Sequence, residues 1–439
     1  MRITIESMAY GADAVGRVDG KAVFVAGAVP GDVVEARVVS TGKSFDRAVV
    51  EQVLEPSPQR IASRCPYAEV CGGCPWSIMT YDAQLQAKQR NVCESLERIG
   101  KFSHETVEEL VAPIIAPGEP WGYRNKIELA TTPTPHGIAL GMHPRQDGAG
   151  VVPVDRCLLL PKAHQKLPRS VAGALRFLGT SHNLGLERVG MRVSTRTGQV
   201  EVALWTDPAA FPRNEVAKVI ADAARPTSLV RVMTKEKSGA RKIAGVERLE
   251  GYGSWEEEIA NGRMRVSAPS FFQVNTAGAD CLVDLVLAGL DPQEGEVAAD
   301  LYCGAGTFTL PLARACDEVV AIESYGPAVR DLKRNLEDSG LAEMVDAVGD
   351  DAARQLDVLE DVDLVVVDPP RAGLDRSVVD ALSESPARTV AYVSCDPATL
   401  ARDLAAFAAT GALHPVRITP VDLFPQTFHV ETVTILQRS

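Results

Sequence analysis

The chain has 439 residues, which is enough for two or three domains that each bury a core of their own. Hydrophobic residues make up 46% and charged residues 23%, as in an ordinary globular protein, and no apolar run is long enough for a membrane span. The net charge of −13 does not exclude a nucleic acid, because residues 265–439 alone carry 28 acidic and 12 basic side chains. The N-terminus has no basic segment followed by an apolar run, so no signal peptide is expected. We therefore expect a cytoplasmic, monomeric protein with no membrane partner.

Residues 1–60 are predicted to form a small β-barrel. The segments ITIES, KAVFVAG, DVVEARVVS and RAVVEQVL alternate between apolar and polar residues, as half-buried strands do. Asp19-Gly20 suits a tight hairpin turn, and Pro30-Gly31-Asp32 marks the next turn. Short strands this close together predict a five-stranded OB-like barrel, which binds oligonucleotides or is a module without a ligand. With RNA bound, four cations of this segment would contact phosphates: Arg17, Lys21, Lys43 and Arg47.

The nine cysteines are not spaced like a disulfide framework. Cys65, Cys71 and Cys74 follow a C-x5-C-x2-C pattern, and the Gly72-Gly73 pair lets the last two thiols bend around one metal centre. A tetrahedral or cluster site needs a fourth soft ligand, for which we choose Cys157. The spacing favours a metal over a plain turn, but it leaves zinc and iron–sulfur both open.

Residues 61–264 carry these cysteines and are otherwise the least informative part of the chain. Strand-like runs alternate with helical ones, which predicts an α+β domain that contributes to substrate binding. In WGYRNKIEL, two aromatic residues stand beside Arg124, Asn125 and Lys126. Such groups stack on a base and hold phosphate, or they form a surface loop that leads into a strand.

Residues 265–439 are predicted to form an α/β domain of the nucleotide-binding type. Apolar strands at 296–302, 318–324, 345–351, 362–370 and 389–395 alternate with helices, including one at 307–316. Continuous apolar runs of this kind are typical of parallel strands that are covered on both faces. The segments 414–424 and 429–438 indicate a closing antiparallel pair. Ligands of such folds bind at the carboxyl ends of the strands, where the candidate residues stand.

The first three strand ends carry residues suited to S-adenosylmethionine (SAM). Gly304 and Gly306 allow a ligand to approach the backbone closely after the first strand. Glu323 ends the second strand, where a carboxylate binds ribose hydroxyls, and Asp350 ends the third, where it can accept from an adenine amino group. Each acid alone could be a solvated loop residue, but the ordered set without a GxGxxG loop favours SAM over a dinucleotide.

The fourth and fifth strands end in residues that indicate the reaction. Asp368-Pro369-Pro370 is followed by Arg371, whereas enzymes that methylate amino groups have an aromatic residue there. Cys395 follows the fifth strand at the start of a helix, whose dipole favours a thiolate. A lone cysteine is otherwise a small buried apolar residue, but its place beside the predicted SAM site makes it a candidate nucleophile.

Five motifs resemble, in order and spacing, the RNA 5-methyluridine methyltransferase family: FFQVN at 271–275, DLYCGAGTFTLP, DPPRAGL, SCDPATLARD and FPQTFHVETV. The segment AYGADAVGRVDGKAVFVAGAVPGD resembles a TRAM domain, an RNA-binding appendage. With the TRAM-like barrel and the four cysteines, the chain most resembles the iron–sulfur branch of the family, typified by 23S rRNA uracil-5-methyltransferases. The resemblance covers essentially the whole chain and is most specific over 267–439.

The resemblance implies a SAM-dependent enzyme that methylates uracil C5 in RNA, with 23S rRNA as the first expectation. Cys395 would attack uracil C6, and Glu431 would remove the C5 proton. Asp368 would also hold the uracil edge, and Arg371 would contact RNA. Thr307 stands where the family often has Asn, which leaves its part in SAM binding in doubt. The resemblance assigns SAM to Gln273, Tyr302, Glu323, Asp350 and Asp368, and a [4Fe-4S] cluster to Cys65, Cys71, Cys74 and Cys157.

Three alternatives stay open at this point. An RNA cytosine-C5 methyltransferase uses the same cysteine chemistry and differs in its product. A tRNA uracil-C5 methyltransferase differs only in the RNA. An RNA-binding scaffold with an inactive methyltransferase domain is a third possibility, and the intact set of Gln273, Asp368, Cys395 and Glu431 speaks against it.

Overall fold

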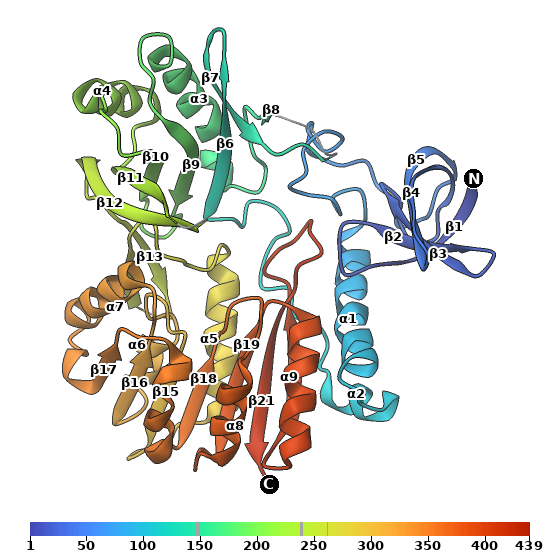
Figure 1. Cartoon of the computed structure of the whole chain (residues 1–439), viewed down its shortest axis with the longest axis vertical. Helices are drawn as coiled ribbons and strands as arrows, with labels where there is room; N and C mark the ends of the chain where they lie inside the picture. The colour runs from blue at the N-terminus through green and yellow to red at the C-terminus, as the bar shows by residue number, and fades with distance from the viewer. Residues whose placement is uncertain (146–149, 238–239, 261) are drawn as a thin grey trace.

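The computed structural model of the chain describes residues 1–145, 150–237, 240–260 and 262–439. Figure 1 shows three regions: a small barrel at the N-terminus, a sheet with two helices in the middle of the chain, and an α/β region that ends at the C-terminus. The α/β region turns one end of its sheet toward the middle region. In the described ranges, no helix is both long and apolar enough to cross a membrane.

The N-terminal region is the predicted five-stranded barrel, closed in the order β1-β2-β3-β5-β4. Asp19 (φ 50°) and Gly20 (φ 80°) form the tight turn between β2 and β3, as predicted. Alternate residues such as Ile3 and Ile5 fill the interior, each 2% exposed. The strands are β1 (Arg2–Met8), β2 (Ala14–Val18), β3 (Lys21–Ala26), β4 (Val33–Thr41) and β5 (Phe45–Glu55).

Two helices connect the barrel to the middle of the chain and lie along the α/β region (Figure 1). They are α1 (Tyr81–Arg98) and α2 (His104–Leu110). Val92 and Leu96 of α1 are buried in the same core as side chains of the α/β region. The helices thus belong by packing to the C-terminal region, although they fall in the range predicted for the central domain. The domain boundaries at 60 and 264 stay predictions.

The middle region contains a seven-stranded sheet in the order β12-β11-β10-β9-β6-β7-β8, with α3 (Leu167–Leu178) and α4 (Arg213–Ala224) packed against it. A separate hairpin of β13 (Trp255–Ile259) and β14 (Gly262–Val266) leads into the last region. The predicted mixture of strands and helices is therefore confirmed. The sheet strands are β6 (Lys126–Thr134), β7 (Gly137–Met142), β8 (Val152–Pro153), β9 (Leu186–Val193), β10 (Val200–Thr206), β11 (Ser228–Lys237) and β12 (Ala240–Gly251).

The C-terminal sheet has the order β17-β16-β15-β18-β19-β21-β20, in which β15 to β19 are parallel and β20 and β21 form the predicted antiparallel pair. Its strands are β15 (Val297–Leu301), β16 (Glu318–Ile322), β17 (Val345–Val348), β18 (Leu364–Val367), β19 (Thr389–Ser394), β20 (Leu413–Val421) and β21 (Glu431–Arg438). Its helices are α5 (Thr276–Leu290), α6 (Thr309–Leu312), α7 (Gly326–Asp338), α8 (Arg376–Glu384) and α9 (Pro397–Thr410).

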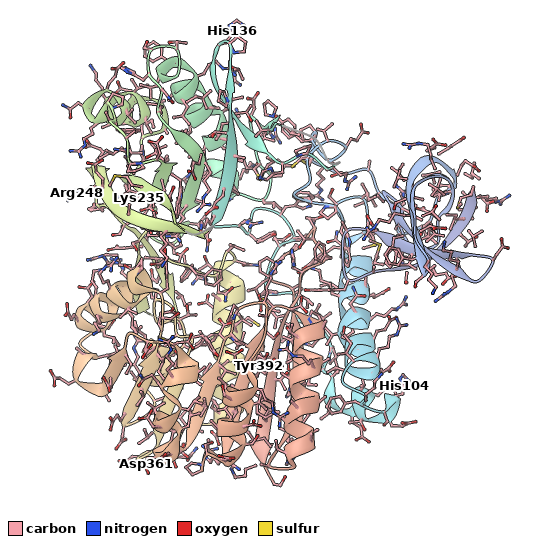
Figure 2. The ribbon with its side chains drawn as sticks, viewed as in Figure 1. His104, His136, Lys235, Arg248, Asp361 and Tyr392 are labelled. Atoms are coloured by element: carbon pink, nitrogen blue, oxygen red, sulfur yellow. The ribbon has the colours of Figure 1, made fainter. Side chains whose placement is uncertain are left out.

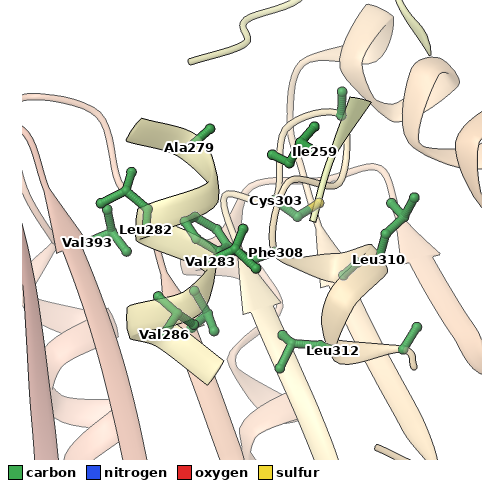
Figure 3. Close-up of a cluster of buried hydrophobic side chains, with 14 of the residues drawn as sticks. Ile259, Ala279, Leu282, Val283, Val286, Cys303, Phe308, Leu310, Leu312 and Val393 are labelled. Carbon is green, nitrogen blue, oxygen red and sulfur yellow. The ribbon is translucent and has the colours of Figure 1, made fainter. Parts of the chain in front are cut away.

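One face of this sheet is covered by α5, which is apolar on most sides. Leu282, Val283 and Val286 of α5 pack with Phe308 in a buried cluster (Figure 3). The helix predicted over 307–316 is shorter than expected, since only α6 is helical. After Leu312, the amides of Arg314 and Ala315 bond to carbonyls three residues back, at 3.2 and 2.8 Å, so the α-helix ends in a tighter turn.

The parallel strands run toward the middle region. Asp361, which precedes β18, lies at the far end of the α/β region, and Tyr392 of β19 lies nearer the middle region (Figure 2). His104 and His136 lie at the periphery, away from the carboxyl ends of these strands (Figure 2). The carboxyl ends, where ligands of such folds bind, therefore face the interior of the molecule.

Candidate active site

The turn after β15 has a backbone that few residues adopt. Tyr302 lies in the left-handed region at φ 67°, which is uncommon for a residue with a side chain and is typical of functional turns. Gly306 follows at φ 103°, and a Cβ atom there would lie 2.4 Å from Leu310 Cδ1. The backbone after β15 can therefore take this path only with glycine at 306.

Acidic side chains gather at the carboxyl ends of β15, β16 and β18. The Glu323 carboxylate accepts hydrogen bonds from the amides of Gly304 (3.0 Å) and Tyr325 (2.6 Å), so it joins the first two strand ends. Burial raises the pKa of Asp300 to about 7 and that of Asp368 to about 7. The charges of Asp368 and Glu323 raise the pKa of Asp300 further, which shows that the three carboxyls are neighbours.

Asp350 stands at the end of the next strand, β17, as predicted. Its carboxylate accepts from the Asp351 amide (2.8 Å) and from Gln355 Nε2 (2.9 Å). These hydrogen bonds lower the pKa of Asp350, so it is ionised at neutral pH. The local contacts fix this carboxylate in the loop that follows β17.

Gln273 lies just before α5 and is 4% exposed. Its Oε1 has no hydrogen-bond partner among the residues that the structure describes, although it is buried. Its backbone is fixed, because Asn125 Nδ2 donates to the Gln273 carbonyl (2.9 Å) and to Thr276 Oγ1 (3.0 Å). The asparagine of the WGYRNKIEL segment thus holds Gln273, while the base-stacking and phosphate-binding roles considered for this segment stay predictions.

Cys395 and Glu431 meet because β19 and β21 are antiparallel neighbours. Ser394 pairs with Thr432 in this register, which places Cys395, the residue after Ser394, beside Glu431, the residue before Thr432. Glu431 is 3% exposed, and burial followed by the charge of Asp368 raises its pKa well above the usual value. The residues predicted as nucleophile and base are therefore brought together at one sheet edge.

The Cys395 thiol is not activated by the helix that follows it, contrary to the prediction. Burial, followed by the charges of Glu431 and Asp368, raises its pKa to about 12, and Arg371 lowers it by a smaller amount. The first free amides of α9 are already bonded to Asp396, at 2.9 Å from Ala398 and 3.1 Å from Thr399, and Pro397 has no N–H. The helix terminus thus has its own cap and leaves the thiol protonated in the protein without RNA.

The loop 422–430 precedes Glu431 and is held at two points by helix α1. Lys88 Nζ, from α1, donates to Asp422 (2.5 Å) and to the Phe424 carbonyl (3.0 Å), and both side chains of the ion pair are 0% exposed. Gln84 Oε1 accepts from the amide of Gln426, a residue at φ 73°. Helix α1 therefore fixes the conformation of this loop.

His429 lies in the same loop and pairs with Arg371. Burial, followed by the charge of Arg371, lowers the His429 pKa to about 4, so the ring is neutral and can accept a hydrogen bond. Arg371 Nη2 lies 3.2 Å from its Nδ1, and the ring packs on Phe428 with centroids 4.1 Å apart. The pair links the loop after β18 to the loop before β21.

The four cysteines predicted as metal ligands line one cavity of about 390 Å³, together with Arg124 and Trp121. All nine cysteines of the chain are free. Burial raises the pKa of Cys74, and the charges of the other three cysteines add to this effect. In the part of the chain that is described, no three His, Cys, Asp or Glu side chains are placed to hold a metal ion. The cysteines thus share a cavity without forming a finished site for one ion.

Two family models match the chain: the tRNA (uracil-5-)-methyltransferase family over residues 258–439, and the TRAM domain over residues 1–48. An RNA methyltransferase of Gloeobacter violaceus, itself uncharacterised, is 36% identical over all of this chain and 96% of its own length. The chain belongs to the RNA (uracil-5-)-methyltransferase family. An uncharacterised RNA methyltransferase of Halalkalibacterium halodurans is 32% identical, again over the whole chain and 96% of the relative.

A solved structure is similar to this methyltransferase along its length. The tRNA (uracil-54, C5)-methyltransferase of Pyrococcus abyssi, in complex with S-adenosyl-L-homocysteine, matches with a TM-score of 0.75 and 26% identity over 99% of each chain. The likeness supports the fold of the whole chain.

Sequence reasoning missed three residues that shape the methyltransferase site. Lys88 lies in an ordinary helical pattern, so only its partner across the fold reveals its role. His429 is part of the quoted FPQTFHVETV motif and was not singled out. Tyr10 belongs to the barrel, yet its hydroxyl donates to the carbonyl of Cys395 at 3.1 Å. None of the three has a spacing signal that predicts its partner.

Three of the four barrel cations suggested as phosphate contacts, Arg17, Lys21 and Arg47, lie in ion pairs. Lys21 bonds to Asp46 at 2.6 Å, and Arg17 lies 3.6 Å from Glu6. Arg47 pairs with an aspartate at 3.1 Å and lies over two aromatic rings of the barrel. The exposed pair of Arg17 is weak, so a phosphate can compete for this cation.

Proposed function

We propose that this chain transfers a methyl group from SAM to C5 of a uracil in RNA and forms 5-methyluridine. The observation that carries the proposal is the antiparallel register of β19 and β21, which brings Cys395 and Glu431 together beside Asp368. A thiol nucleophile and a separate buried carboxyl base are what C5 methylation requires and N-methylation does not.

The residues at the neighbouring strand ends fit SAM. The buried Oε1 of Gln273 has no partner in the described residues and suits the ammonium group of an amino acid. Glu323 is fixed by two backbone amides and keeps lone pairs for ribose hydroxyls. Tyr302, Asp350 and Asp368 complete the set that we assign to SAM. When bound, SAM supplies an electrophilic methyl group.

The side chains then act in a defined order. The Cys395 thiol gives its proton to water, and the thiolate then forms a bond to uracil C6, so that the electron pair of the C5–C6 double bond makes C5 nucleophilic. Once the methyl carbon has left the sulfur of SAM for C5, with S-adenosylhomocysteine as the leaving group, the Glu431 carboxylate accepts the remaining C5 proton, the double bond re-forms, and the thiolate leaves. The raised pKa of Glu431 suits a group that must hold a proton, and Arg371 stabilises the thiolate.

The substrate is an RNA with an accessible uridine, and we propose 23S rRNA as the first candidate. A tRNA is the second candidate, since a structural relative along the full length is a tRNA (uracil-54, C5)-methyltransferase. The TRAM barrel, residues 1–60, would bind RNA outside the target nucleotide, and residues 61–264 would help to select it. Mapping 5-methyluridine in rRNA and tRNA of a strain without this chain decides between the two.

We further propose that Cys65, Cys71, Cys74 and Cys157 bind a [4Fe-4S] cluster. Four thiols around a cavity of about 390 Å³ offer the ligand number of such a cluster and more room than one zinc ion needs. Protein purified without oxygen should contain iron and acid-labile sulfide. Zinc without iron in that preparation would show that the proposal is wrong.

The proposed reaction is tested with the full chain, SAM and RNA. Wild-type protein should form 5-methyluridine, Cys395→Ala should form none, and Glu431→Gln should accumulate a covalent protein–RNA adduct because the C5 proton stays in place. A product of 5-methylcytidine would overturn the choice of uracil. Methylation by Cys395→Ala, or full turnover by Glu431→Gln without an adduct, would remove the role given to each residue.

A further inference from the structure

We infer that Tyr10 of the N-terminal barrel is a positioning residue for the methyl transfer. Its hydroxyl holds the loop that carries Cys395, and its ring holds the loop that carries Glu431. The inference rests on the proposed function, because it concerns the alignment of that nucleophile and that base. It assigns the barrel a part in the active site in addition to RNA binding.

The segment between β1 and β2, residues 9–13, is fixed to the rest of the molecule. Trp76 Nε1 donates to the carbonyl of Gly11 at 3.1 Å, and Asn91 Nδ2 of helix α1 donates to the carbonyl of Ala9 at 3.4 Å. Tyr10 lies between these two anchored carbonyls. The position of its side chain is therefore determined by the interface between the barrel and the α/β region.

The side chain of Tyr10 contacts both loops of the proposed reaction. Its hydroxyl donates to the carbonyl of Cys395 at 3.1 Å, one peptide away from the cap of α9. Its ring meets the ring of Phe428 edge to face, with centroids 5.6 Å apart. Phe428 in turn packs on His429, two residues before Glu431.

The electrostatic surroundings of Tyr10 agree with this position. Burial raises the pKa of its hydroxyl, and the charges of Asp396, Cys395 and Glu431 add to the shift. The hydroxyl thus stays protonated and remains a donor to the Cys395 carbonyl throughout the physiological pH range. Tyr10 thus fixes the backbone carbonyl of Cys395, although the two residues are 385 positions apart in the sequence.

Two variants separate the contacts. Tyr10→Phe removes the hydroxyl and keeps the ring, while Phe428→Leu removes the ring contact and keeps the hydroxyl. Loss of one hydrogen bond, or of one aromatic pair, corresponds to about a three- to ten-fold change in an equilibrium or a rate. Tyr252→Phe is the matched control, because Tyr252 is 70% exposed in a turn of the middle region.

The experiment uses the full chain with RNA that contains 5-fluorouracil, which traps the covalent adduct because fluorine cannot leave as a proton does. At saturating RNA and SAM, Tyr10→Phe should form the adduct about three- to ten-fold more slowly than wild type, with an RNA Kd within two-fold. On ordinary RNA, Phe428→Leu should slow release of the methylated product by a similar factor. Tyr252→Phe should match wild type in every measurement.

The outcomes distinguish this inference from the proposed function. If wild type forms the adduct and Tyr10→Phe forms it equally fast, the inference is wrong and the proposed function stands. If Tyr10→Phe changes only the RNA Kd, Tyr10 is an RNA contact and not a positioning residue. If wild type forms no adduct on any uracil-containing RNA, the proposed function fails and this inference fails with it.

Discussion

The buried ion pair between Lys88 and Asp422 is the contact whose removal should have the largest effect on the loop before Glu431. Both side chains are 0% exposed and lie 2.5 Å apart, and Lys88 also bonds to the Phe424 carbonyl at 3.0 Å. Lys88→Met fills most of the same volume but leaves a buried carboxylate without its cation. Breaking a buried pair in this way costs about 3–5 kcal/mol.

This cost should appear first as local opening of the loop. A loss of about 3 kcal/mol or more raises the population of the open loop by about 100-fold or more. Hydrogen exchange measured by mass spectrometry should therefore show faster exchange in the peptide that covers 422–431, while the sheet of the middle region keeps its wild-type rates. Methyl transfer should fall because Glu431 loses its fixed position.

Two further variants make the test specific. Lys218→Met changes the same residue type at an exposed position of α4 and should leave the exchange of 422–431 unaltered. In Lys88→Met/Asp422→Asn the buried charge is absent, so more than half of the lost protection should return. If Lys88→Met exchanges as slowly as the Lys218→Met control, the loop is held by its other contacts and the reasoning is wrong.

The remaining predictions concern the thiol and the glycine turn. Only the thiolate reacts with iodoacetamide, and the charge of Glu431 raises the Cys395 pKa while that of Arg371 lowers it. Glu431→Gln should therefore speed alkylation of Cys395 at pH 9, and Arg371→Gln should slow it. Mass spectrometry of the peptide that contains Cys395 measures both rates. In wild type, alkylation should rise with pH up to the pKa of about 12; a plateau reached below pH 9 would contradict this value. Gly306→Ala should weaken binding of S-adenosylhomocysteine by about ten-fold or more in calorimetry, because its Cβ would meet Leu310 at 2.4 Å and φ is 103°; unchanged affinity would show that the turn adapts.

Much of the fold was predictable because local chemistry determines it. Asp19-Gly20 predicts its hairpin from the conformations that these two residues adopt. Continuous apolar strands predict a covered parallel sheet, and β15 to β19 confirm it. The predicted length of α6 was wrong, since the pattern of apolar residues across 307–316 does not reveal the tighter turn that follows Leu312. The packing of α1 on α9 depends on tertiary contacts, and no periodicity indicates which core a helix joins.

The residues of the candidate site were likewise predictable only where local sequence reveals them. Residues that stand at strand ends, such as Glu323 and Cys395, were found because strand ends are visible in sequence. The protonation of Cys395 was predicted with the wrong sign, because the sequence does not reveal that Asp396 occupies the helix amides or that Glu431 lies beside the thiol. Contacts such as that of Tyr10 join positions hundreds of residues apart and leave no local pattern.

The place of β21 in the sheet has a consequence for synthesis of the chain. This strand follows β19 and β20 in the sequence, yet it inserts between them in the sheet. A nascent chain that ends before residue 431 carries the nucleophile without the base, and its sheet has an open slot. Cys395 and Glu431 therefore come together only once β21 has paired with β19. Methylation activity is thus a readout of the insertion of β21 between β19 and β20.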